Sequence, residues 1–127
     1  MAFNKELIND TNYNKKIMKL ETPFILVFST KTCPHCRVVE KFLEKIQNDF
    51  ESIEIFIIES EKSPKLLEKF GVRAFPTTFF FNKEKMSEGR IVGEGTIEEF
   101  FDNFNLLVGR KKKGFLQRIF GGKNEKN

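Results

Sequence analysis

Hydrophobic positions along the chain form two patterns, continuous apolar runs and stripes with helical spacing. The runs at 23–29, 53–58 and 77–81 show no alternation, which is typical of strands buried on both faces of a sheet. A weaker run at 5–8 and a short one at 90–92 add two further strands. The sequence therefore predicts a sheet of five short strands.

The longest helical stripe begins at Pro34 and runs to Phe50. Polar residues lie outside this stripe and should face water. The predicted buried positions are Val38, Val39, Phe42, Leu43, Ile46 and Phe50, and the predicted exposed positions are Glu40, Lys41, Glu44 and Lys45. This segment is the clearest helix in the chain.

Three other helices are predicted from their start and stop signals. One covers 11–19, a second begins at Ser63 and Pro64 and ends at Gly71, and a third opens with a capping box at 96–99. The last helix should bury Ile97, Phe100, Phe101, Phe104 and Val108. The order β-α-β-α-β-α-β-β-α indicates an α/β fold, a central mixed β-sheet flanked by helices on both faces.

The 127 residues are 39% hydrophobic and include 16 phenylalanines, enough for one domain with a packed core. No apolar run approaches the roughly 20 residues of a membrane helix. The chain starts without a basic segment followed by an apolar one, so we expect a cytoplasmic protein, in a compartment that keeps thiols reduced. We also expect a monomer.

Charge is distributed unevenly along the chain. Seven of the 22 basic residues and one of the 18 acidic residues lie at 110–127, so this tail carries +6. Residues 1–109 then carry 15 basic and 17 acidic side chains, a net charge of −2. We therefore expect a domain at 1–109 that does not bind nucleic acid, followed by a basic C-terminal tail. For the tail we favour a solvated segment over contact with an anionic membrane surface or an acidic partner.

The two cysteines of the chain, Cys33 and Cys36, stand two residues apart between the 23–29 strand and the long helix. A zinc site would need a second ligand pair, which the sequence lacks, and a structural disulfide of this span would constrain little. A redox-active pair that needs no bound metal or cofactor is the favoured interpretation.

Thiolate chemistry assigns roles to the segment Cys33-Pro34-His35-Cys36. Cys33 lies at the helix start, where unpaired N–H groups and the dipole favour a thiolate, so it should attack the substrate disulfide. Cys36 lies one turn further into the helix and should resolve the mixed disulfide. Pro34 suits the first helical position, and His35 should tune Cys33 by adding positive charge. Arg37 either contributes in the same sense or is simply solvated.

Pro76 precedes the 77–81 strand and permits two interpretations. A proline is tolerated at the first residue of a strand without special function. A cis bond would instead turn the chain tightly and leave backbone groups of residue 75 free for an incoming peptide. The residues alone leave both possibilities open.

Residues 5–108 resemble the thioredoxin family. The resemblance rests on the strand, Cys33-Pro34-His35-Cys36 and helix unit, on Gly71-Val72-Arg73-Ala74-Phe75-Pro76-Thr77, and on Val92-Gly93 before the last helix. It implies the thioredoxin fold and a cis Pro76 that packs against the cysteine pair. It also implies a substrate groove lined by Thr32, Phe75, Pro76 and Gly93.

The sequence departs from the family at four places. The spacer is Pro34-His35 in place of Gly-Pro, and Thr32 replaces the usual tryptophan before the first cysteine. Val27 stands in place of the family's buried carboxylate, and Ile57 in place of its lysine neighbour. The acid that helps to deprotonate the second cysteine is therefore missing, so either Cys36 resolves more slowly or water or His35 takes over this role.

Two functions from different classes follow. The favoured one is a thiol–disulfide oxidoreductase that mostly reduces protein disulfides and receives electrons from an NADPH-dependent flavoprotein reductase. Because positive charge near Cys33 stabilises the reduced form, its potential should lie between about −270 mV for thioredoxin and about −120 mV for an oxidising relative. The alternative is a binding module of the kind associated with bacteriocin export, recruited through the tail.

Overall fold

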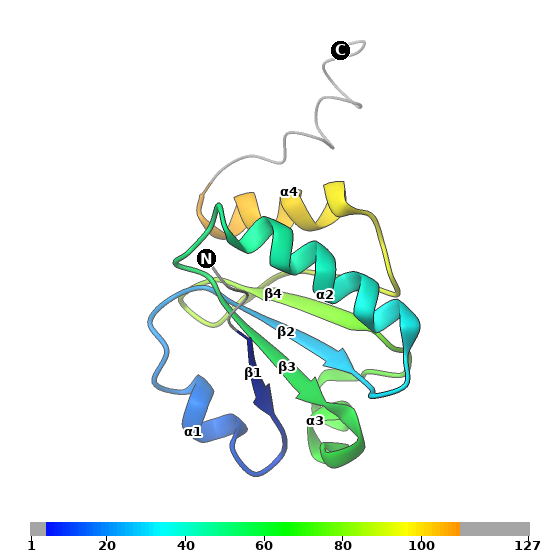
Figure 1. Cartoon of the computed structure of the whole chain (residues 1–127). Coiled ribbons are helices and arrows are strands. Elements are labelled where there is room, and N and C mark those ends of the chain that lie inside the picture. The colour runs from blue at the N-terminus through cyan, green and yellow to red at the C-terminus, as the bar shows by residue number, and fades with distance from the viewer. Residues whose placement is uncertain (1–4, 110–127) are drawn as a thin grey trace.

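The computed structural model describes residues 5–109, and its centre is a five-stranded mixed sheet (Figure 1). The strands are β1 (Lys5–Ile8), β2 (Phe24–Ser29), β3 (Glu54–Glu59), β4 (Thr77–Phe81) and β5 (Ser87–Val92). Their spatial order is β1-β3-β2-β4-β5. The first three lie parallel, whereas β4 is antiparallel to both of its neighbours. All five predicted strands are present, and β5 begins earlier than the sequence pattern predicted.

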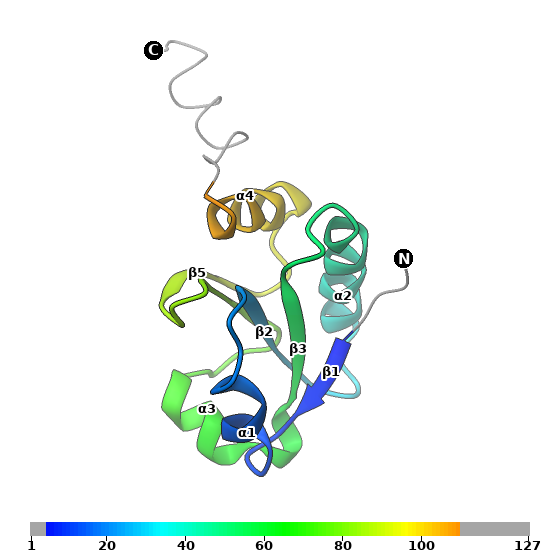
Figure 2. The same ribbon diagram turned by 90° about the vertical axis from the view of Figure 1, so that its left-hand side faces the viewer.

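Helices cover both faces of this sheet, as predicted. They are α1 (Tyr13–Ile17), α2 (Pro34–Gln47), α3 (Pro64–Phe70) and α4 (Ile97–Leu107), with a single 3₁₀ turn, η1 (Ser60–Lys62). Figures 1 and 2 show α2 and α4 on one face of the sheet and α1 and α3 on the other. The predicted tail at 110–127 lies outside the described residues.

The sheet separates two hydrophobic layers, because successive side chains of β2, β3 and β4 point to opposite faces. The layer beneath α2 and α4 contains Val27, Ile57 and Phe80 from the sheet. The opposite layer contains Phe28, Phe56 and Phe79, and α1 and α3 pack on it. Every residue of β2 is buried, which confirms the prediction from its unbroken apolar run.

Three helix positions differ from the predicted burial. Glu40 was expected to face water but is only 9% exposed. Its carboxylate lies 3.4 Å from the Arg37 guanidinium, and this ion pair accounts for a charged group at the edge of the core. In α4, Phe101 is 38% exposed and Val108 is also exposed, whereas Leu107 packs in the core. The helix ends at Leu107, so Val108 leaves the stripe that its spacing suggested.

Helix ends follow their predicted signals at two of three points. The capping box of α4 is present, since Glu99 N–H donates to Thr96 Oγ1 and Thr96 N–H donates to Glu99 Oε1. Gly71 ends α3 in the left-handed region, with φ of 65°. Ser63 does not cap α3 with its side chain, because its hydroxyl donates to the Glu59 carbonyl. Asp10 caps α3 instead from the loop after β1.

Candidate active site

Cys33 is the N-cap residue of α2, directly after the loop that follows β2. Its extended backbone lets Cys33 Sγ turn back over the helix start, where it accepts a hydrogen bond from Cys36 N–H at 3.2 Å. Pro34 occupies the first helical turn, as predicted. Both cysteines are free thiols in this structure. The first turn of α2 therefore brings the two sulfur-bearing side chains together.

The two cysteines differ in their access to solvent. Cys33 is half-buried, whereas Cys36 is completely buried beneath it. Burial is the main reason that the pKa of the Cys36 thiol is raised, and hydrogen bonding to Cys33 acts in the same direction. Hydrogen bonds from the Ser29 side chain and the Thr30 backbone oppose this rise. Cys33 is thus the thiol that solvent can reach, and Cys36 lies behind it.

The loop before β4 brings Pro76 to the cysteine pair. The Phe75–Pro76 peptide bond is cis, as the resemblance implied. The Cys33 thiol lies 3.9 Å from the Phe75 carbonyl oxygen, to which it can donate. Gly93 N–H donates to the Pro76 carbonyl at 2.7 Å, and the φ of 86° at Gly93 is one that glycine adopts without strain. Cys33, Phe75, Pro76 and Gly93 are therefore brought together.

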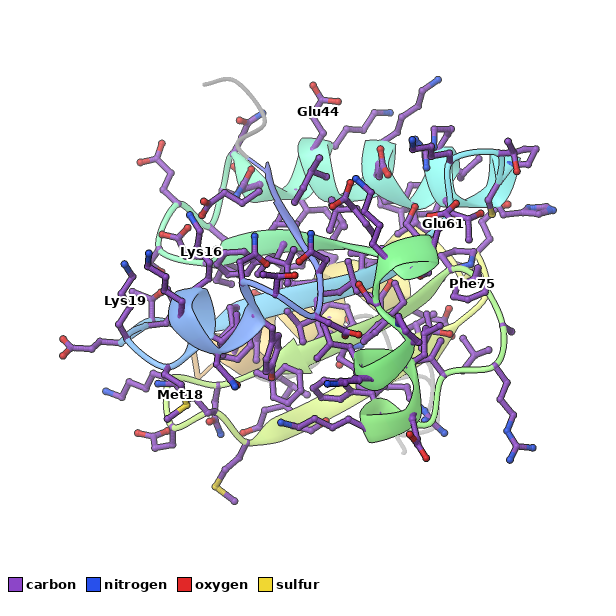
Figure 3. All side chains as sticks on the ribbon, turned by 90° about the horizontal axis from the view of Figure 1, so that it is seen from below. Lys16, Met18, Lys19, Glu44, Glu61 and Phe75 are labelled. Atoms are coloured by element: carbon purple, nitrogen blue, oxygen red, sulfur yellow. The ribbon has the colours of Figure 1, made fainter. Side chains whose placement is uncertain are left out.

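Thr32 is exposed immediately before Cys33. Figure 3 places Phe75 and Glu61 at the same end of the molecule, far from Lys16 and Lys19 on the α1 side. Glu61 accepts a hydrogen bond at 2.9 Å from the backbone N–H of Lys31, the residue before Thr32. This bond is the main reason that the pKa of the Glu61 carboxyl is lowered. The loop that carries Thr32 is thus tied to η1.

His35 is 69% exposed and faces a partner that the sequence did not reveal. Its Nδ1 lies 2.7 Å from Glu94 Oε1, in the loop between β5 and α4. The predicted positive charge of His35 is therefore accompanied by a negative one. The one signal in the sequence that could have identified Glu94 is its position directly after Gly93, a predicted groove residue.

Val27 and Ile57 are direct partners in the β2–β3 register, and both side chains are buried in the layer beneath α2. The places where the family carries an acid and a lysine are therefore apolar here. Arg37, whose role the sequence left open, donates to Ser29 Oγ at 3.0 Å and to the Thr30 carbonyl at 2.8 Å. Ser29 was not predicted as a site residue, because a lone serine at the end of an apolar strand carries no signal.

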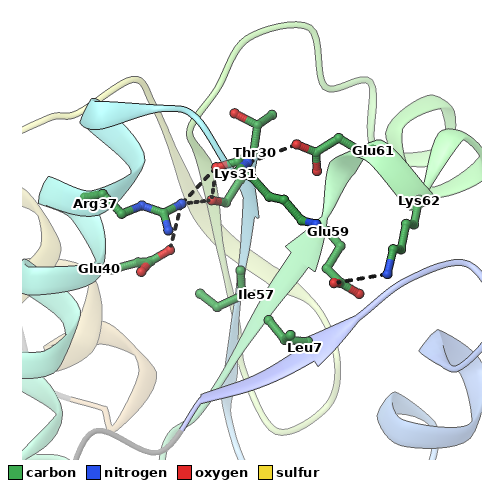
Figure 4. A pocket seen from close by; sticks show the side chains of 10 residues that line it. Leu7, Thr30, Lys31, Arg37, Glu40, Ile57, Glu59, Glu61 and Lys62 are labelled. Carbon is green, nitrogen blue, oxygen red and sulfur yellow. Dashed lines mark hydrogen bonds and ion pairs between the residues drawn. The ribbon is translucent and has the colours of Figure 1, made fainter.

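A cavity of about 240 Å³ lies beside this cluster, between β1, β3 and the start of α2 (Figure 4). Leu7 and Ile57 contribute apolar surface to it, and charged side chains surround them. Lys62 pairs with Glu59 across 3.8 Å at one edge. Ser29 and Arg37 also line the cavity.

The thioredoxin family model matches residues 4–105. The chain belongs to the thioredoxin family. The family identification and the α/β fold predicted from the sequence are both confirmed.

Curated relatives are distant. The chain is 22% identical over 102 residues to a chloroplastic M-type thioredoxin of Pisum sativum, covering 78% of this chain and 59% of that protein. It is 22% identical over 85 residues to a thioredoxin of Rickettsia bellii, covering 66% of this chain and 81% of the relative. The chain thus spans about three fifths of the pea protein that it matches.

Solved structures show the same fold. Chloroplastic thioredoxin z superposes with a TM-score of 0.72 at 18% identity, over 85% of this chain and 97% of that one. The thioredoxin of Malassezia sympodialis gives a TM-score of 0.70 at 14% identity, over 86% and 94% of the two chains. Within residues 5–109, no helix has the length and apolar character needed to cross a membrane, and no three His, Cys, Asp or Glu side chains gather as metal ligands would.

Proposed function

We propose that this protein is a thiol–disulfide oxidoreductase that reduces protein disulfides through Cys33 and Cys36. The observation that carries the proposal is the position of the pair. The partly exposed Cys33 Sγ accepts a hydrogen bond from Cys36 N–H at the start of α2, and the thiol of Cys36 is buried. A helix start favours a negative charge at that sulfur, and only a thiolate attacks a disulfide.

The reaction has two steps. The Cys33 thiolate attacks one substrate sulfur, the substrate S–S bond breaks, and its electron pair leaves on the other substrate sulfur, which takes a proton from water. Cys36 then loses its proton to water and attacks Cys33 Sγ. The Cys33–substrate bond breaks, the second substrate thiolate is released, and the pair is left as a disulfide. The substrate gains two electrons, and the cysteine pair loses them.

The predicted groove residues have separate roles in this proposal. Phe75 and Gly93 offer backbone groups to an extended substrate segment on either side of Cys33, and Pro76 shapes the surface between them. Thr32 is a small contact in place of the flat apolar surface that the family's tryptophan would provide. Pro34 and His35 tune Cys33 from the first turn of α2. The proximity of Cys33 to the Phe75 carbonyl supports this arrangement.

Oxidised protein must be reduced again for turnover. The exchange itself uses only the two thiols, so the electrons must come from another protein. We propose that this donor is an NADPH-dependent flavoprotein reductase. Net flux toward substrate reduction requires that this donor be more reducing than the Cys33–Cys36 pair. Location in the cytoplasm and a monomeric state stay predictions.

Reduction of insulin disulfides with dithiothreitol as electron donor tests the proposal. Wild-type protein should accelerate insulin precipitation, and Cys33→Ser should abolish the acceleration. Cys36→Ser should still attack and should accumulate a Cys33–substrate mixed disulfide, visible on a non-reducing gel. Lys41→Ala, on an exposed part of α2, serves as the control and should retain full activity. Undiminished turnover by Cys33→Ser would contradict the assignment.

A further inference from the structure

Glu94 lies in a short turn whose backbone is fixed on both sides. Gly93 before it has a φ of 86° and Gly95 after it has a φ of 65°, values that glycine adopts without strain. Gly93 N–H donates to the Pro76 carbonyl at 2.7 Å. A Cβ on Gly95 would lie 2.8 Å from Ile91 Cγ2, so this glycine is packed closely against β5. The backbone that carries Glu94 is therefore attached to the Pro76 loop and to the edge of the sheet.

The Glu94 carboxylate reaches the first turn of α2, where the cysteine pair lies. Glu94 Oε1 is 2.7 Å from His35 Nδ1, and His35 stands two residues after Cys33. Figure 1 shows the loop that enters α4 close to the start of α2. Cys33 Sγ lies 3.9 Å from the Phe75 carbonyl oxygen, in the loop of Pro76. Contacts thus run from Cys33 through the Pro76 loop to the turn of Glu94, and back through His35 to α2.

Both members of this ion pair are open to solvent. The His35 side chain is 69% exposed and the Glu94 side chain is 39% exposed. An exposed pair contributes little stability, so a cation on a bound substrate can replace His35 as the partner of the carboxylate. Lysine and arginine carry their charge at the end of a long, flexible side chain. Either of them can reach Glu94 from a position next to the substrate cysteine that is bonded to Cys33.

The other charged side chains of the loops around the site are of both signs. Lys31 and Arg73 are exposed basic residues in the loops that follow β2 and α3. Glu61 accepts a hydrogen bond from the Lys31 backbone, and Arg37 donates to the end of β2. Lys31 and Arg73 would favour acidic substrates, whereas Glu94 would favour basic ones. The contribution of Glu94 is therefore measured by the change in preference when Glu94 is replaced.

We propose that Glu94 is a specificity-determining residue, which favours protein disulfides that have a lysine or arginine next to the attacked cysteine. His35 holds the carboxylate in position, and the substrate cation takes the place of His35 on binding. Glu94 exchanges no proton and no electrons, and the bonds that form and break are those of the two steps given above. The inference rests on the proposed function, because it names the substrate class of that same site.

A pair of matched peptides tests this preference. Each peptide carries one cysteine in a disulfide with nitrothiobenzoate, and the two differ only in a lysine or a glutamate beside that cysteine, placed on either side in turn. Attack by Cys33 releases the coloured thiolate, and a Cys36→Ser background stops the reaction at the mixed disulfide. The measured quantity is the ratio of the two rate constants, lysine peptide over glutamate peptide. A change in the reactivity of Cys33 itself cancels in this ratio.

Glu94→Gln should lower the ratio about fivefold, a modest effect because the carboxylate is exposed. Glu94→Lys should lower it further, and His35→Ala should raise it, since the carboxylate then has no partner on α2 to give up. These changes should shrink at high salt. Glu98→Gln, on the exposed first turn of α4, is the matched control and should leave the ratio unchanged. An unchanged ratio in Glu94→Gln, or an equal fall in Glu98→Gln, would overturn the proposal.

An equilibrium measurement separates this inference from the proposed function. Cys36→Ser protein is equilibrated with each peptide thiol and its disulfide, and the yield of the mixed disulfide gives the preference without any turnover. A preference that depends on Glu94, in a protein whose wild type does not reduce insulin, would sustain the Glu94 assignment while contradicting the oxidoreductase function. Insulin reduction by wild type, together with a mixed-disulfide preference that is the same with and without Glu94, would contradict only the assignment.

Discussion

At the scale of single residues, the two cysteines of the candidate site lie in different surroundings. We propose that the helix start and His35 tune Cys33, and His35 is paired with Glu94 across the predicted groove. Burial is the main reason that the pKa of Cys36 is raised, and Ser29 and the Thr30 backbone oppose this rise. Cys33 also acts to raise the pKa of Cys36, so a change at the first cysteine should reach the second.

The first residue-scale prediction concerns the charge pair at the groove. Positive charge near Cys33 stabilises the thiolate of the reduced form and raises the reduction potential, and the Glu94 carboxylate offsets that charge. Glu94→Gln should raise the potential and His35→Gly should lower it, each by about 10–20 mV, because exposed pairs contribute little. Equilibration with glutathione at neutral pH measures both variants.

Glu84→Gln, in the loop before β5, should leave the potential unchanged. The two shifts should also shrink in high salt, because both partners are exposed. If His35→Gly left the potential unchanged, His35 would be a passive spacer, and the predicted charge effect would be wrong.

At the scale of elements, helix ends show how local and distant signals combine. Thr96 and Glu99 cap α4 within one turn of sequence. The start of α3 is satisfied by Asp10, whose two carboxylate oxygens accept from Lys65 N–H and Leu66 N–H at 2.9 and 3.0 Å. A cap provided by a residue outside the helix ties the β1–α1 loop to α3.

Removing this distant cap should destabilise the fold. Asp10→Ala leaves two N–H groups of α3 without their acceptors, so it should cost about 1 kcal/mol of unfolding free energy. The melting temperature should fall by about 4–8 °C for a domain of this size. Asp10→Asn retains an acceptor oxygen and should lose less. Asp49→Ala, on an exposed surface after α2, is the matched control, and an equal loss in both alanine variants would contradict the capping role.

The sequence predicted those features of the fold and of the site that are caused by neighbouring residues. The buried strand 23–29, the stripe of α2 and the Thr96 box are all properties of neighbouring residues, and all are confirmed. The Asp10 cap and the His35–Glu94 pair join segments 55 and 59 residues apart, so no local pattern contains them. The helix pattern predicts that Glu40 faces water, but the side chain is nearly buried and paired with Arg37, which the spacing of apolar residues does not show.

At the scale of the whole molecule, the sheet separates two apolar layers, and the candidate site lies at one end of both. The layer beneath α2 and α4 supports the cysteine helix, and the opposite layer supports the loop that ends in Pro76. Phe75 itself packs against this second layer. Global stability and site geometry are therefore coupled, and ionisation of a buried group should affect both.

Alkaline pH should reveal this coupling. Burial raises the pKa of Cys36 above its ordinary value of 9.0, so its neutral form contributes stability that is fully present below pH 9.0 and is lost as pH rises through the folded-state pKa. Urea unfolding of reduced protein should show a steeper alkaline loss in wild type than in Cys36→Ala. Tyr13, whose pKa burial also raises, acts with the same sign from about pH 10, so both proteins should carry Tyr13→Phe. Parallel profiles would contradict the effect.

The division of charge leads to the last prediction. Residues 1–109 carry a net −2, and 110–127 carry +6, yet all the groups of the candidate site lie within residues 5–109. A chain that ends at Gly109 should therefore reduce insulin at a rate within about twofold of the full chain, since a terminal segment outside the domain tolerates removal. A Cys33→Ser/Cys36→Ser full chain should be inactive. If the double cysteine variant kept the protein's function and the chain that ends at Gly109 lost it, the binding module would be favoured over the oxidoreductase.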